Sequence, residues 1–149
     1  MSEPNRFKVR CRGIILHEGR LLVVRHAPDH RYVALPGGGL EWGEDALACM
    51  KREIVEELGV EPKIGRLLYV NTFISGETQS MEFFFEILNG ADYVGCEKLD
   101  RTHAFELAEL LWIKPDAATE LLPRALAEDF KNGKLLSDTP RFISDLKAS

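Results

Sequence analysis

The stretch Gly37–Val60 reads GGGLEWGEDALACMKREIVEELGV. Apolar residues recur through its second part at spacings of three and four, which predicts a helix from about Asp45 to Leu58. Gly59 follows at the position where glycine commonly ends a helix. The apolar positions are Leu47, Met50, Ile54 and Leu58. The stretch therefore joins a glycine run to an acidic helix with one apolar side.

Three carboxylates share one side of this expected helix. At about 100° per residue, Glu53, Glu56 and Glu57 occupy roughly 100° of the helix surface, next to the apolar stripe. Like charges at these spacings repel each other, and Arg52 alone cannot balance three anions. A hard cation such as Mg²⁺ or Mn²⁺ would balance them, since both prefer oxygen ligands. The alternative is an acidic helix face that contacts only water.

The residues around the carboxylates favour a ligand site. Ala46 and Cys49 are small and lie on the same helix face, which leaves room for a ligand. Gly37, Gly38 and Gly39 are expected to form an open loop before the helix. Glycines permit close backbone approaches, so backbone groups of this loop can face a metal or a phosphate. The pattern is neither that of a Rossmann fold nor that of a P-loop.

The whole stretch resembles the Nudix box, the motif of the Nudix hydrolase family (MutT-like). Every defining position of the box is present, and the flanking Leu35-Pro36 and Trp112-Ile113 also resemble the family pattern. The matching positions are Gly38, Glu44, Arg52, Glu53, Ile54, Glu56, Glu57, Gly59 and Val60.

This resemblance implies a divalent-metal site and a set of catalytic residues. The implied metal ligands are Glu53, Glu56, Glu57 and a backbone carbonyl of Gly37 or Gly38. Arg52 would orient Glu53, which takes the place of a general base in several family members, and Glu57 would join the catalytic set. Glu44 would support the helix that carries them.

Residues outside the box complete the expected site. Relatives often carry one more carboxylate before the last strand, which makes Glu106 the first candidate; the rivals are Glu82, Glu97 and Glu109. Trp42, in the box loop, is a candidate for stacking on a base. Arg25 belongs to a basic cluster that could meet substrate phosphates. The cluster is Arg6, Lys8, Arg10, Arg12, Arg25, His26, His30 and Arg31.

The rest of the chain predicts strands before and after the helix. Two hairpins are expected, one joining Phe7–Leu16 to Leu21–Val24 and one joining Leu67–Ile74 to Met81–Leu88. Further short strands are expected at Tyr32–Leu35 and Glu109–Ile113, and two helices within Pro115–Phe130, divided by Pro123. The expected fold is α/β, a Nudix-type α/β/α sandwich with a mixed sheet, in a single domain over residues 1–149.

Composition limits the partners and the compartment. The formal net charge of -5 and the lack of a basic run argue against nucleic acid, and no apolar run is long enough to span a bilayer. Three widely spaced cysteines and no secretory leader indicate a reducing, cytoplasmic setting. The run Phe83–Phe85 fits either core on both faces of one strand, the preferred interpretation, or a homodimer surface.

The function predicted from these features is metal-dependent hydrolysis of a pyrophosphate bond in a nucleoside diphosphate linked to another moiety. The substrate would be a nucleotide, a nucleotide sugar or a dinucleoside polyphosphate. The alternative is a catalytically silent domain that senses nucleotide ligands. An isomerase on the same fold is less favoured, because Cys49 and Cys96 lack the surrounding motifs such enzymes carry.

Overall fold

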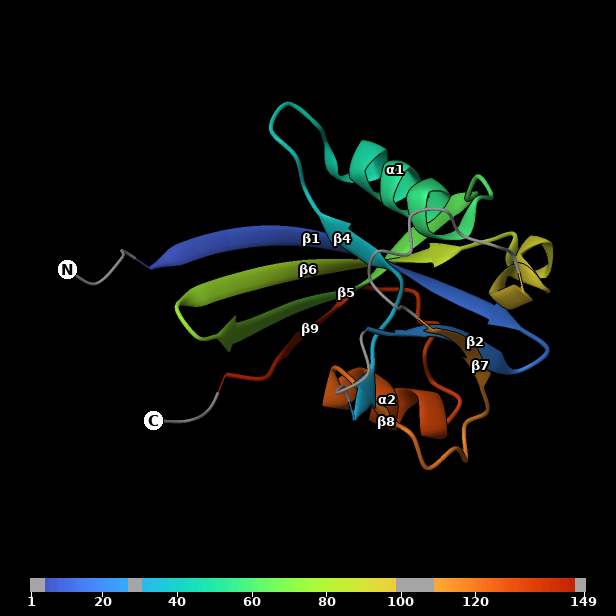
Figure 1. Cartoon of the computed structure of the whole chain (residues 1–149). Coiled ribbons are helices and arrows are strands. Elements are labelled where there is room, and N and C mark those ends of the chain that lie inside the picture. The colour runs from blue at the N-terminus through green and yellow to red at the C-terminus, as the bar shows by residue number, and fades with distance from the viewer. Residues whose placement is uncertain (1–4, 27–30, 99–108, 147–149) are drawn as a thin grey trace.

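Figure 1 shows the computed structural model of the chain, which describes residues 5–26, 31–98 and 109–146. A mixed β-sheet runs through the molecule, with helix α1 on one side and helix α2 on the other. The described strands of this sheet are β1 (Arg6–His17), β2 (Arg20–Arg25), β4 (Gly37–Gly39), β5 (Ile64–Ser75), β6 (Thr78–Ile87), β7 (Glu109–Ile113) and β9 (Arg141–Ser144). The fold is therefore the expected α/β/α sandwich.

Strand β1 organises the sheet, whose order is β7-β2-β1-β6-β5-β9. It runs parallel to β6, with Arg10 opposite Glu82, and antiparallel to β2 and β4. The β1–β2 and β5–β6 pairs are the two hairpins expected from the sequence. A separate small sheet pairs β3 (Tyr32–Val33) with β8 (Glu120–Leu121).

Helix α1 (Ala46–Leu58) has a defined cap at each end. The Asp45 side chain accepts a hydrogen bond from the backbone N–H of Ala48 at 2.8 Å, which satisfies a group that the first turn leaves unpaired. At the other end Gly59 adopts the left-handed conformation, with φ of 78°, and donates to the carbonyl of Val55. Helix α2 (Arg124–Lys131) and the short 3₁₀ helices η1 (Gly90–Tyr93) and η2 (Cys96–Lys98) complete the described helices.

Apolar side chains pack on both faces of the sheet. One cluster joins Met50 and Ile54 of α1 to Phe85, and the other joins Leu126 and Phe130 of α2 to Phe84. Because neighbouring strand residues point to opposite faces, Phe84 and Phe85 belong to different clusters. The core interpretation of Phe83–Phe85 is therefore confirmed.

Three local expectations were wrong. Residues 115–122 contain no helix, because Leu121 lies in β8 against Val33, and α2 begins only after Pro123. The glycine run forms strand β4 against β1 instead of an open loop. Within α1, Leu47 is exposed and Cys49 is fully buried, because β4 packs over the N-terminal half of the helix.

The helices described in the structure are all too short or too polar to cross a lipid bilayer.

Candidate active site

A cavity of about 580 Å³ lies on the face of the sheet that is turned away from α1. Its floor is formed by alternate residues of the three central strands, which point to the same face because side chains alternate along a strand. They include Lys8, Arg10 and Arg12 of β1, Ser80, Glu82 and Phe84 of β6, and Asn71 and Phe73 of β5. Tyr32 and the segment Leu122-Pro123 also line the cavity. Its size is typical of a small-molecule site.

The carboxylates of α1 reach this cavity past the edge of β4. Glu53 and Glu57 lie one helical turn apart and both line the cavity. Glu56 is more exposed, with 58% of its side chain accessible, and its carboxylate lies 3.3 Å from Arg52. The structure thus brings two of the three box carboxylates to one end of the cavity.

Arg52 forms hydrogen bonds with two acidic side chains, Glu44 before the helix and Glu53 within it. Its Nε and Nη2 donate to the two carboxylate oxygens of Glu44 at 2.8 and 2.7 Å, and its Nη1 donates to Glu53 Oε1 at 2.9 Å. Nη2 also donates to the carbonyl of Gly39 at 3.0 Å. The hydrogen bonds from Arg52 lower the pKa of Glu44 to about 2, so this carboxylate stays ionised. The guanidinium therefore orients Glu53 and ties α1 to β4.

Strand β4 can lie this close to its neighbours because its residues are glycines. A Cβ on Gly37, whose φ is 147°, would lie 2.0 Å from the carbonyl oxygen of Cys11. A Cβ on Gly38 would lie 2.5 Å from the carboxylate of Glu53. Cys49, below the strand, lies 3.8 Å from the Gly38 carbonyl oxygen, and burial raises its pKa to about 12. The small residue at position 49 therefore makes room for β4, whereas the sequence suggested room for a ligand.

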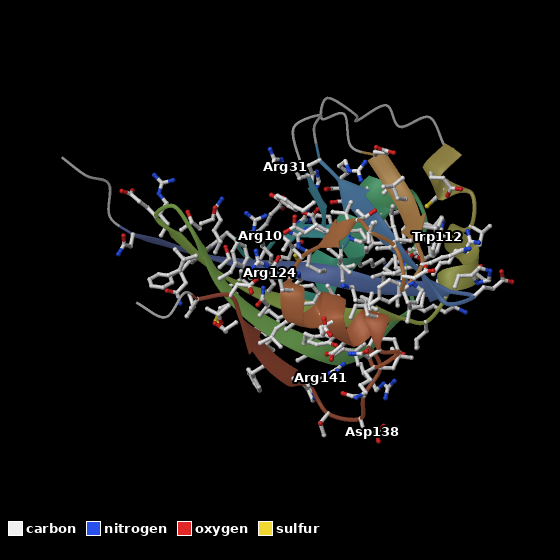
Figure 2. The ribbon with its side chains drawn as sticks, turned by 90° about the horizontal axis from the view of Figure 1, so that it is seen from below. Arg10, Arg31, Trp112, Arg124, Asp138 and Arg141 are labelled. Atoms are coloured by element: carbon white, nitrogen blue, oxygen red, sulfur yellow. The ribbon has the colours of Figure 1, made fainter. Side chains whose placement is uncertain are left out.

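Three cationic side chains of β1, Lys8, Arg10 and Arg12, line the floor of the cavity. Arg12 forms an ion pair with Glu82 at 2.8 Å and donates to the carbonyl of Leu35. Arg10 forms no ion pair within the described residues, and its Nε is buried without a hydrogen-bond partner there. Figure 2 shows Arg10 on this side of the sheet, well away from Trp112. Lys8 and His26 line the same cavity.

The remaining predicted residues differ in where they lie relative to the cavity. Gly37 lines the cavity, and Gly38 lies under Glu53 without lining it. Trp42 is fully exposed and is not among the lining residues. Arg25 lies 3.4 Å from Glu109 on the neighbouring strand, outside the cavity. Glu106 lies outside the described residues.

Several lining residues were not singled out by the sequence. The alternation Lys8, Arg10, Arg12 along one strand is a visible signal that could have separated these cations from the rest of the basic cluster. Asn71 had no such signal, because its burial depends on strands that are distant in sequence.

The donor atoms at the α1 end fit a hard divalent cation. Glu53 and Glu57 offer carboxylate oxygens, the ligands that Mg²⁺ and Mn²⁺ prefer. No group of three or more acidic, His or Cys side chains converges on one point among residues 5–26, 31–98 and 109–146. Two carboxylates still suit Mg²⁺, which is commonly held by one or two carboxylates together with water and substrate phosphates.

A family model, a curated protein and solved structures all match this chain. A family model described as "NUDIX domain" matches residues 7–135. The ADP-ribose pyrophosphatase of Methanocaldococcus jannaschii is 33% identical over 84 residues, which is 52% of this chain and 50% of that protein. The chain thus matches about half the length of this curated relative.

Solved structures share the fold. A MutT NUDIX hydrolase from Burkholderia pseudomallei is 26% identical, with a TM-score of 0.63 over 85% of this chain and 97% of that one. A UDP-X diphosphatase is 22% identical, with a TM-score of 0.64 over 96% of this chain and 68% of that one.

Proposed function

The chain belongs to the Nudix family, and from this premise we propose that it hydrolyses a pyrophosphate bond in a nucleoside diphosphate linked to another moiety. The observation that carries the proposal is one cavity that holds Glu53 and Glu57 at one end and Lys8 and Arg10 on its floor. Carboxylates suit a metal and a base, and cations offset the charge of phosphate groups. Hydrolysis of a pyrophosphate ester is served by both kinds of group, the carboxylates and the cations.

The proposed metal is Mg²⁺ or Mn²⁺. Glu53, Glu56 and Glu57, with the backbone carbonyl of Gly37, are the proposed ligands, of which Glu53, Glu57 and Gly37 line the cavity. A bound divalent cation neutralises phosphate charge and lowers the pKa of a coordinated water. Glu56 does not line the cavity, and its Oε2 lies 3.3 Å from Arg52 Nη1.

The side chains of this protein then have distinct roles. Glu53 takes a proton from the attacking water, a step that typically contributes about 10²–10⁴-fold. Arg52 binds Glu53 Oε1 and so fixes the direction in which the carboxylate faces the cavity. Arg10 and Lys8 attract the phosphate chain and offset its charge. Glu106 stays a proposed additional base.

The substrate is proposed to be a small nucleotide derivative. The name of the curated relative supports ADP-ribose as one substrate to test, and the UDP-X diphosphatase supports nucleotide sugars. The aromatic side chains of Tyr32 and Phe73 line the cavity, where either could stack on a base.

Phosphate release from a panel of substrates tests the proposal. The panel contains nucleoside triphosphates, ADP-ribose, nucleotide sugars and dinucleoside polyphosphates, each with Mg²⁺ or Mn²⁺ and with an EDTA control. Glu53→Gln is expected to lose turnover by orders of magnitude, while Glu61→Gln, which alters an exposed pair with Lys51, keeps it. Binding of nucleotides with no turnover of any substrate would contradict the hydrolase and favour the nucleotide sensor.

A further inference from the structure

A buried polar chain crosses the floor of the cavity from β1 to β5. Arg12 Nε donates to Glu82 Oε2 at 2.8 Å, and Asn71 Nδ2 donates to Glu82 Oε1 at 3.0 Å. Asn71 is 2% exposed and Glu82 is 6% exposed, and both line the cavity. These three residues come from adjacent strands, so their backbones hold the chain of hydrogen bonds in place.

This arrangement fixes the orientation of the Asn71 amide. The carboxylate of Glu82 forms an ion pair with Arg12 and accepts a hydrogen bond from Asn71, so the NH₂ group of Asn71 faces Glu82. The carbonyl oxygen Oδ1 therefore points elsewhere. It is buried and has no hydrogen-bond partner among the described residues. Buried acceptors are paired in most proteins, and Asn71 lines the cavity, so its unpaired Oδ1 is suited to a hydrogen-bond donor on a ligand.

The groups beside Oδ1 narrow the choice of donor. Glu82 lies directly across from Asn71 in the β5–β6 register, and its carboxylate oxygens, which accept from Asn71 Nδ2 and Arg12 Nε, each have a second acceptor position, so acceptors of Glu82 and Asn71 occur on adjacent strands. An NH₂ group, with two hydrogens, suits such a pair. A ligand carbonyl at this point would meet two acceptors and be repelled. Arg10 lies on β1 opposite Glu82, so strand β6 separates it from Asn71.

Phe73 gives this position an aromatic neighbour. It lies two residues after Asn71 on β5, on the same face of the strand, and lines the same cavity. A planar base stacked on Phe73 would present its edge toward Asn71.

We propose that Asn71 selects substrates whose base carries an exocyclic amino group, adenine or cytosine, over their oxo counterparts hypoxanthine and uracil. This inference rests on the proposed function for its substrate class. Asn71 accepts one hydrogen of the amino group through Oδ1, and the carboxylate of Glu82 attracts the other.

Matched substrate pairs test the inference without changing the protein. Adenosine and inosine derivatives, or cytidine and uridine derivatives, differ at one exocyclic group and the adjacent ring nitrogen and share the phosphate chain. We consider the pair that the wild-type protein turns over faster. In that pair we expect kcat/KM to be at least about tenfold higher for the adenosine or cytidine derivative than for its inosine or uridine counterpart. Equal values, or a preference for the oxo member, would overturn the inference and leave the hydrolase intact.

Variants assign the preference to Asn71. Asn71→Leu is expected to bring the ratio within a pair close to one, while the exposed control Asn132→Ala keeps the wild-type ratio. Circular dichroism establishes that Asn71→Leu folds. A folded Asn71→Leu that keeps the full preference would contradict the role of Asn71.

Equilibrium binding separates this inference from the proposed function. Dissociation constants of AMP against IMP, and of CMP against UMP, require no turnover. Tighter binding of the amino member by a protein that cleaves nothing would support the base site and contradict the hydrolase. Equal binding within both pairs would overturn the base site.

Discussion

Gly38 lies directly beneath the carboxylate of Glu53, so close that a methyl group at Gly38 would come within 2.5 Å of it. The absence of a side chain on β4 therefore determines where a proposed catalytic carboxylate can sit. The atoms in the way are the far end of a flexible side chain, which can move aside.

Gly38→Ala is therefore expected to lower activity much more than stability. Displacing the Glu53 carboxylate costs about 0.5–1.5 kcal/mol of side-chain strain, whereas misplacing a catalytic group by an ångström can cost about 100-fold in turnover. Kinetics and urea unfolding of the same sample measure both effects.

Gly37→Ala is the matched control, because its clash is with backbone. The new Cβ would lie 2.0 Å from the Cys11 carbonyl oxygen, at a φ of 147° that other residues rarely adopt. We expect a loss of roughly 1–3 kcal/mol or more in the free energy of unfolding. Similar stability losses in the two alanine variants would contradict this account of β4.

Arg52→Lys tests Arg52 as a positioning residue. A lysine cannot reproduce the two hydrogen bonds to Glu44 together with the bond to Glu53. We expect kcat to fall by about 10–100-fold with KM nearly unchanged, since the loss affects the orientation of Glu53 more than substrate binding. A rise in KM at constant kcat would show that Arg52 acts on substrate affinity instead.

The Arg52–Glu44 pair should also give an acid-dependent stability. The folded-state pKa of Glu44 is lowered to about 2 from an ordinary value of 4.5, so the folded protein favours the ionised form. The ion pair therefore adds to the free energy of unfolding. This stabilisation is fully present above the unfolded-state pKa of Glu44 and is lost as the pH falls from about 4.5 through about 2. Urea midpoints across this range should therefore fall less steeply for Glu44→Gln than for wild type. Identical slopes would show that the pair does not contribute.

Arg10→Gln tests the cation on the cavity floor. Removing this charge should raise KM for a phosphate-rich substrate and weaken its dependence on salt, because less electrostatic attraction remains to be screened. The control Arg20→Gln makes the same change in net charge on an exposed residue outside the cavity. Equal effects of the two substitutions would mean that only net charge matters.

The cysteines should be unreactive in the folded protein. Cys11, Cys49 and Cys96 form no disulfide bond and are buried, and burial raises the pKa of Cys11 and Cys49, so little thiolate is present at these two positions. Alkylation at neutral pH, followed by mass spectrometry, should label none of them in native protein and all of them in urea. Rapid labelling of Cys49 in native protein would show that β4 opens easily.

The sequence predicted the parts of this protein that depend on neighbouring residues. Helix α1 followed from the spacing of its apolar residues and from Gly59, and both hairpins followed from short turns between strand-like runs. Helical spacing predicted that Glu53 and Glu57 share one face of α1. These features are set by local backbone geometry and by side-chain periodicity. The roles of Glu53 and Glu57 as metal ligand and base came from the resemblance to the Nudix box and stay proposals.

The tertiary structure decided which distant residues meet. Arg12 and Glu82 are 70 positions apart, and they form an ion pair only because β1 and β6 run parallel in one register. A shift of one residue in that register would turn every side chain of the strand to the other face, so the floor of the cavity could not be inferred from composition or spacing. Segments 37–39 and 120–121 became strands for the same reason: each forms hydrogen bonds with a partner strand that its own sequence does not specify.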